Sequence, residues 1–166
     1  EGGYEAGYRS ARYEPDTVSP NVVQGSPSNF AAAGVRGATI AGGGVPAGDT
    51  DPVYTNEGPN VVHAAYGTVG GGYANQAGDA AGSPFGGPFA TVGGGANNTA
   101  SGVISPIGGG TGNTASGVVS TVGGGMGNTA SGYAATVMGY SNTASGFAAT
   151  AMGYATSASG GVSTAL

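Results

Sequence analysis

The residues able to do acid–base or metal chemistry are confined to the first half of the chain. All eight Asp and Glu, all three Arg and the one His, His63, occur at or before Asp79, and residues 80–166 contain none of these types. A general base needs a hydrogen-bonded partner, and a zinc site needs clustered Cys and His. The chain has no Cys and offers His63 no such partner. We therefore expect His63 to be a surface residue rather than a catalytic base.

Four carboxylates remain as candidates for paired acid–base or cation chemistry, namely Asp49, Asp51, Glu57 and Asp79. Their spacing follows no period, so it indicates neither a glycosidase pair nor a calcium-binding repeat, which requires an Asp in each turn. Asp49 and Asp51 could share one cation, although a solvated loop is the simpler interpretation. We expect no enzyme activity, no catalytic residue, no metal site and no cofactor.

Glycine makes up 38 of the 166 residues and forms several triplets. A phosphate-binding loop needs a Lys at the phosphates, and this chain has none. A dinucleotide site would need a strand, a glycine turn, a helix and an acidic residue about 20 positions on, and no triplet has that context. The net charge of −5 and the pI near 4.3 exclude the basic surface that nucleic acid requires. No apolar run reaches membrane-spanning length, so we expect no direct membrane insertion of this segment.

The regular spacing that organises the chain lies instead in residues 91–166. Three units of fifteen residues are followed by two of fourteen, and Thr164 opens another: 91–105, 106–120, 121–135, 136–149 and 150–163. Self-similarity at a fixed short period determines the fold before local propensity does. Units this short have room for two short strands and two tight bends, which is one turn of a β-solenoid. We predict an all-β fold, a parallel β-roll with 14–15-residue turns.

Each unit places one aliphatic residue and one alanine at inward-facing positions, since side chains alternate along a strand. The predicted roll interior consists of Val92, Ile107, Val122, Val137, Ala151, Ala100, Ala115, Ala130, Ala144 and Ala158. Glycine recurs at both bends, where we expect it to supply positive φ. A column of Asn suits the same bends, because Asn tolerates the left-handed region and stacked Asn can hydrogen-bond along the stack: Asn98, Asn113, Asn128 and Asn142.

The first ninety residues follow the pattern less closely. Residues 1–20 are expected to form an N-terminal arm or cap, and residues 21–90 to form irregular solenoid turns with long inserted loops at 45–67 and 80–90. Insertions into solenoid turns emerge as surface loops. The second insertion carries Phe85 and Phe89, which either fold over the roll or form a ligand-facing loop. Folding over the roll is favoured, because exposed aromatic patches are uncommon without a partner.

Two runs in the regular part resemble a known family. Residues 121–132 (TVGGGMGNTASG) and 149–160 (ATAMGYATSASG) are similar to the head repeats of trimeric autotransporter adhesins, the YadA-like heads. The resemblance covers residues 68–166 well and residues 21–67 weakly. It implies a left-handed parallel β-roll, three chains side by side, and a place in a cell-surface fibre that binds host or environmental surfaces. The Gly triplets replace a bulkier apolar residue of the family pattern, and the repeats lack charge, so the ligand stays open.

Assembly also follows from the residues themselves. One outward column contains Gly93, Gly108, Gly123, Met138 and Met152, and another contains Val103, Val118, Tyr133, Phe147 and Gly161. An apolar stripe on an uncharged rod favours association, and closed cyclic symmetry would bury it. We take Val103, Val118, Tyr133, Phe147, Met138 and Met152 as the candidate assembly stripe of a parallel homotrimer. Since Leu166 lies three residues into a new turn, we expect the natural protein to continue with more repeats or a stalk.

Three functions are compatible with these patterns. The first is a structural and adhesive head of an extracellular fibre with an unknown surface receptor. The second is a phage-like tail fibre, which the neighbouring genes would reveal. The third is an ice-binding solenoid, because hydroxyl columns recur at Thr99/Ser101, Thr114/Ser116, Thr129/Ser131 and Thr143/Ser145. Bends rich in Asn and Gly make poor flat faces, so we rank the ice-binding interpretation third.

Overall fold

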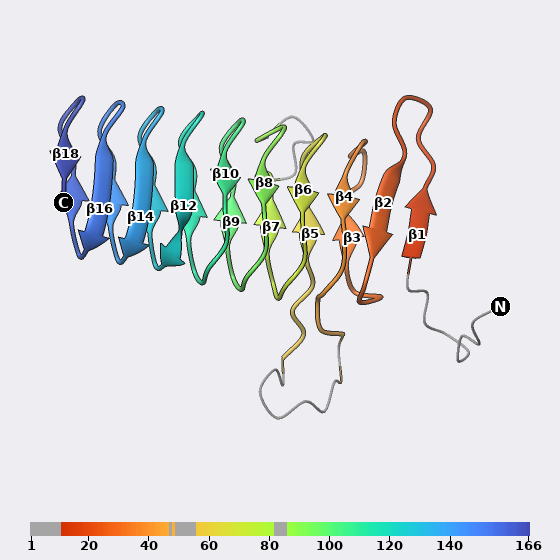
Figure 1. Ribbon diagram of the computed structural model, residues 1–166. Coiled ribbons are helices and arrows are strands. Elements are labelled where there is room, and N and C mark those ends of the chain that lie inside the picture. Colours follow the sequence, from red (N-terminus) through yellow and green to blue (C-terminus); the bar gives the residue numbers. More distant parts are fainter. Residues whose placement is uncertain (1–10, 47, 49–55, 82–85) are drawn as a thin grey trace.

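The fold is built from short strands alone. The computed structural model describes residues 11–46, 48, 56–81 and 86–166, and this part of the chain contains no helix (Figure 1). Sheet A has ten strands: β1 (Ala11–Glu14), β2 (Asn21–Gln24), β4 (Thr39–Ile40), β6 (Thr68–Val69), β8 (Thr91–Val92), β10 (Pro106–Ile107), β12 (Thr121–Met126), β14 (Thr136–Tyr140), β16 (Thr150–Tyr154) and β18 (Thr164–Ala165). Sheet B has eight: β3 (Phe30–Ala31), β5 (Val61–Val62), β7 (Gln76–Ala77), β9 (Thr99–Ala100), β11 (Thr114–Ala115), β13 (Thr129–Ala130), β15 (Thr143–Ala144) and β17 (Ser157–Ala158).

From β2 onward, successive strands alternate between the two sheets, so each of these strands pairs with the strand two elements away. Strands β2 to β18 of sheet A run parallel to one another, as do all strands of sheet B. The stacked turns form an elongated rod with β1 and β18 at opposite ends (Figure 1). The protein is therefore an all-β parallel β-solenoid, as the repeat predicts. We call the connection from sheet A to sheet B the AB bend, and the connection back to sheet A the BA bend.

The interior consists of small files of aliphatic residues. Val92, Ile107, Val122 and Val137 pair directly with their neighbours in sheet A, and all ten residues assigned to the interior are at most 2% exposed. A further buried file, which the repeat analysis missed, comes from the BA bend: Ala90, Ser105, Ser120, Ala135 and Ala149. Apolar burial contributes about 25 cal/mol per Å², and a single thin turn buries little apolar surface by itself. Each turn is therefore stable mainly through contact with its two neighbours.

The Asn column lies inside the solenoid. Asn29, Asn60, Asn75, Asn98, Asn113, Asn128 and Asn142 are fully buried. In each step from Asn29 to Asn142, the backbone N–H of one Asn donates to the Oδ1 of the Asn in the preceding turn, at 2.8–3.0 Å. The side-chain Nδ2 of each Asn from Asn60 to Asn142 donates to backbone carbonyls of the glycine bend. Buried amides require such partners, and this Asn ladder provides them at every turn.

The glycines of the two bends have different roles. In the AB bend, Gly95, Gly110 and Gly125 have positive φ, as predicted. Gly102, Gly117, Gly132 and Gly146 of the BA bend do not have positive φ. A Cβ at any of them would collide with the backbone carbonyl oxygen of the corresponding glycine in the next turn. The left-handed residue of this bend lies two positions later and is not glycine: Tyr66, Phe89, Ile104, Val119, Ala134, Ala148 and Val162. The prediction that the BA-bend glycines supply positive φ is wrong, because the constraint comes from the spacing between turns.

The difference between fifteen- and fourteen-residue turns is a bulge in sheet A. Val122 pairs with Val137, but Gly124 rather than Gly123 pairs with Met138, and the register shifts between Val122 and Gly124. The extra residue of the longer turn is thus absorbed within the glycine triplet, as β-bulges absorb one unpaired residue. The predicted column that joins Gly123 to Met138 is therefore displaced by one position.

Both insertions are shorter than the sequence suggests. Residues 61–62 are β5, so the first insertion ends before them, and an antiparallel bridge between Val45 and Gly58 closes its base. In the second, Phe89 N donates to Ala65 O and Ala90 N donates to Gly87 O, as in an ordinary BA bend. Both sheets run through the irregular and regular repeats without interruption, so the two parts form one solenoid.

The N-terminal end of the rod has a cap. β1 pairs antiparallel with β2, whereas all other neighbouring strands of sheet A pair in parallel. Arg12 Nη2 donates to the carbonyl oxygen of Asn29 at 2.6 Å, and Glu14 holds the Arg12 side chain at 2.8 Å. In later turns this Asn carbonyl accepts a backbone N–H from the preceding turn, for example Thr99 N to Asn113 O. The guanidinium therefore replaces a donor of a turn that is missing.

Two serines of the BA-bend file provide a matched test of buried hydrogen bonding. The Ser105 hydroxyl donates to Gly102 O at 2.7 Å, whereas the buried Ser120 hydroxyl has no hydrogen-bond partner among the described residues. Alanine occupies the same place in other turns, for example Ala135. We expect Ser105→Ala to lower the free energy of unfolding by about 1 kcal/mol and Ser120→Ala to leave it unchanged or raise it. Urea denaturation of both variants checks this, and equal losses would contradict it.

Candidate binding surfaces

The residues with acid–base potential do not form a catalytic arrangement in the described part of the chain. Partial burial lowers the pKa of His63 below its usual value, because burial disfavours the imidazolium, and Asp79 only partly opposes this effect. The His63 ring meets the ring of Phe30 edge-on at 6.3 Å between centroids. Glu57 and Asp79 are exposed, and Asp49 and Asp51 lie outside the described residues. Among the residues that the structure describes, no three His, Asp or Glu are grouped as metal ligands.

The outward face of sheet B carries the hydroxyl columns. Thr99, Thr114, Thr129 and Thr143 are paired in one file, and the Ser two positions after each Thr lies in a parallel file on the same face. Neither file makes a side-chain hydrogen bond to other described residues. The columns therefore occupy a sheet and not the bends, and the buried Asn ladder does not interrupt them. The bends rich in Asn and Gly therefore lie outside this face, contrary to the expectation from the sequence.

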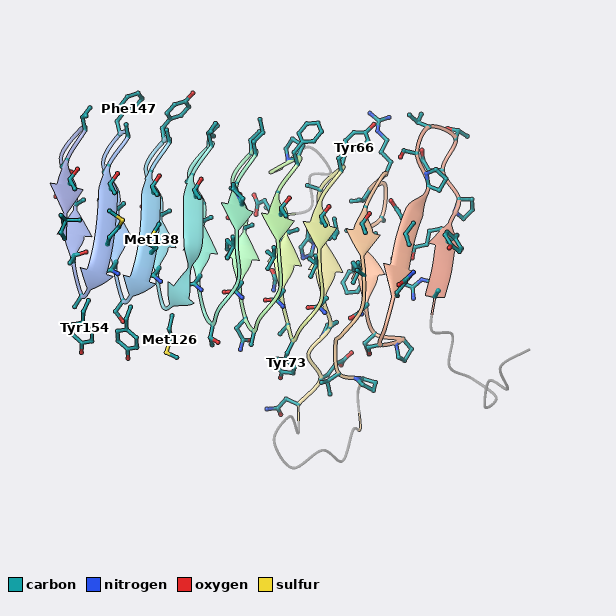
Figure 2. The ribbon with its side chains drawn as sticks, viewed as in Figure 1. Tyr66, Tyr73, Met126, Met138, Phe147 and Tyr154 are labelled. Carbon is teal, nitrogen blue, oxygen red and sulfur yellow. The ribbon has the colours of Figure 1, made fainter. Side chains whose placement is uncertain are left out.

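The outward face of sheet A is uncharged and shallowly hollowed. The hollow is lined by Met138, Met152 and the glycines around them: Gly123, Gly124, Gly125, Gly139 and Gly153. Met138 is 42% exposed, and an ideal Cβ on Gly123 would lie 3.2 Å from Met138 Cε. The Met138 side chain therefore rests beside the glycine bulge of the preceding turn. Figure 2 shows Met138 in the middle of this face, between the two edges of the rod.

The BA edge is an apolar ridge, at the top of Figure 2. We define the BA ridge as its exposed large apolar side chains: Tyr66, Phe89, Ile104, Val118, Val119, Tyr133, Phe147 and Val162. Tyr133 and Phe147 stack with ring centroids 5.3 Å apart, and Tyr66 and Phe89 stack at 5.4 Å. Ile104, Val119 and Val162 have positive φ, which strains β-branched residues. The same conformation recurs at Ala134 and Ala148, so the geometry of the bend imposes it.

The AB edge carries a second, smaller ridge, at the bottom of Figure 2. We define the AB ridge as Met126, Tyr140 and Tyr154, which are 49%, 45% and 75% exposed and paired in one file. Tyr140 and Tyr154 stack at 5.2 Å. The predicted assembly stripe did not include this ridge, although Met-Gly-Tyr recurs in the sequence at a spacing of fourteen residues.

The predicted assembly stripe is therefore divided between two surfaces. Val103, Val118, Tyr133 and Phe147 lie in the BA bend, and Met138 and Met152 lie on the face of sheet A. Phe89 is 53% exposed but stacked on Tyr66, so it lies along the ridge rather than projecting alone. Phe85 lies outside the described residues.

Comparisons of the chain with protein-family models, with curated proteins and with solved structures gave no match. In the described part of the chain, no helix has the length and hydropathy needed to cross a membrane. The functional argument therefore depends on the fold and its surfaces: a rod with two apolar ridges, an uncharged glycine-rich face between them and a hydroxyl face behind.

Proposed function

We propose that this chain is the structural and adhesive head segment of an extracellular trimeric fibre, which attaches to host or environmental surfaces. The observation that carries the proposal is the pair of apolar ridges along a rod whose repeats from residue 80 onward contain no acidic or basic side chain. Large exposed apolar surfaces on soluble proteins usually mark contact sites. Association of identical rods would cover part of this surface and stiffen the fibre.

The stacking of the turns supports a mechanical role. Each turn is hydrogen-bonded to the next through both sheets and through the Asn ladder, and the nine parallel strands β2 to β18 of sheet A extend over about 38 Å at the usual strand spacing. Such a continuous ladder holds the ends of the segment at a fixed distance, as a fibre head requires. The left-handed winding and the cell-surface location belong to the proposal through the resemblance of residues 121–132 and 149–160 to YadA-like head repeats.

The proposal is tested by the mass in solution together with surface attachment. We expect sedimentation equilibrium to give three times the chain mass of 15.4 kDa, and the labelled protein to be retained saturably on a panel of matrix proteins, glycans or cell surfaces. A variant with a broken Asn ladder, Asn113→Ala, controls for dependence on the folded rod. A monomer that no surface retains would contradict the proposal.

Ice binding is the second candidate, and the observation that favours it is the position of the hydroxyl files on a sheet face rather than in the bends. The hydroxyl files Thr99/Ser101, Thr114/Ser116, Thr129/Ser131 and Thr143/Ser145 share one sheet face and have no described partners of their own. Measurable thermal hysteresis that disappears in Thr114→Lys would favour this function over adhesion. Absence of hysteresis in the folded protein would eliminate it.

A further inference from the structure

The exposed large apolar side chains of the regular repeats are distributed on one side of the rod. Between residues 86 and 166 they all belong to the BA ridge, the AB ridge or the face of sheet A, where Leu166 continues the file of Met138 and Met152. The face of sheet B in the same turns presents Thr and Ser. One side of each rod is therefore suited to contact with protein, and the opposite side to contact with water.

The face of sheet A carries glycine in the fifteen-residue turn of β12 and methionine in the fourteen-residue turns that follow. Gly124, next to the bulge, pairs with Met138, and Met138 pairs with Met152. At Gly94 the backbone lacks positive φ and an ideal Cβ would meet no described atom within 4 Å, whereas Gly71, Gly109 and Gly124 at the same position of other turns have φ of 147°, 158° and 148°. Glycine at this position leaves the face of sheet A without side chains, which permits the close approach of another backbone.

The two ridges differ from each other, so a closed ring of parallel rods can join them. In such a ring each rod contributes one ridge to the contact on one side and the other ridge to the contact on the other side, and the number of three copies comes from the proposed function. The BA ridge and the AB ridge are different patches that flank the same face. When each BA ridge contacts the AB ridge of a neighbour, a ring closes with sheet A inside. The absence of acidic and basic side chains after Asp79 removes the like-charge repulsion that identical facing surfaces otherwise suffer.

We propose that sheet A is the face that two further copies of this chain cover, with Met138 and Met152 at the three-fold axis, the BA ridge of each copy against the AB ridge of the next, and sheet B outward. This inference rests on the trimer of the proposed function and adds the arrangement of the chains. It assigns the hydroxyl face of sheet B to the outer surface of the head, where a receptor would meet it.

Because the chain has no Cys, single cysteines report the arrangement directly. We expect Met138→Cys to give covalent dimers with a short bismaleimide, since three equivalent thiols would meet near the axis. Met152→Cys tests the same file if Met138→Cys fails to fold. Ser131→Cys, on the exposed face of sheet B, is the matched control and should not cross-link. The double variant Tyr140→Cys/Phe147→Cys should give covalent trimers, whereas each single edge variant should not link to itself.

The outcomes separate this inference from the trimer itself. A monomeric mass for the unmodified protein overturns both. A trimeric mass with cross-linking through Ser131→Cys, or with none at Met138→Cys and Met152→Cys in folded protein, overturns the arrangement and leaves the trimer standing. Self-linking of Phe147→Cys alone indicates an isologous edge contact, which also overturns it.

Discussion

Replacement of Asn113 by alanine is expected to lower the free energy of unfolding by about 3 to 5 kcal/mol, since it leaves several buried polar groups without partners. Asn113 Nδ2 lies within 3.1 Å of Asn98 Oδ1, Gly109 O and Gly125 O. Its Oδ1 accepts both the backbone N–H and the Nδ2–H of Asn128, each at 3.0 Å. The methyl group of alanine satisfies none of these, and the turn is too tightly stacked for water to replace the amide.

The neighbouring Thr114→Ala is the control for this prediction. Thr114 is half-buried, points outward from sheet B and makes no side-chain hydrogen bond to described residues. Its loss should cost less than about 1 kcal/mol, the range of β-propensity. Urea denaturation followed by circular dichroism, at one protein concentration, compares the two. If Asn113→Ala unfolds no more readily than Thr114→Ala, the Asn ladder is not a stabilising element.

Addition of one methyl group at Gly117 is expected to be comparably damaging. An ideal Cβ there would collide with the carbonyl oxygen of Gly132 and lie 2.8 Å from its carbonyl carbon, both rigid backbone atoms. The two turns cannot separate without loss of the hydrogen bonds Ser116 N to Ala130 O and Thr121 N to Ala135 O. We expect Gly117→Ala to lower the free energy of unfolding by about 3 kcal/mol.

Gly161→Ala supplies the comparison for Gly117→Ala. Gly161 lies in the BA bend of the last complete turn, lacks positive φ and has no atom within 4 Å of its ideal Cβ. The substitution should change stability by less than about 0.5 kcal/mol. Thermal unfolding of the two variants distinguishes a glycine needed for turn spacing from one that is not. A strongly destabilised Gly161→Ala would show that the spacing between turns is not what makes Gly117 necessary.

The period of the repeat made the core predictable. Val92, Ile107, Val122 and Val137 recur at fifteen residues, and a shift of register by one residue would turn all of them outward. The side of the bend on which Asn113 lies was not predictable in the same way, because Asn is common on surfaces. Its burial depends on Gly109 O and Gly125 O of its own and the next turn, and these surround the amide only after the turns have stacked.

The surfaces were harder to predict than the core for a related reason. Columns counted from the start of each unit fail where the unit length changes, since the bulge at Gly123 displaces the partner of Met138. The glycine of the BA bend suggested a local requirement for positive φ, yet Gly117 is constrained by Gly132 of another turn. Rules based on neighbouring residues take no account of the distance between stacked turns. They therefore predicted glycine at this bend correctly but attributed it to positive φ instead of to the close approach of the next turn.

The side chain of Arg12 gives the solenoid a defined origin. Since it satisfies the first Asn carbonyl from outside the stack, every downstream module meets the same environment whatever the number of modules. Duplication or loss of one genetic unit would then change the particle's length in increments of about 4.8 Å without disturbing its starting point. The length of the solenoid can thus change by selection without a change in its N-terminal cap.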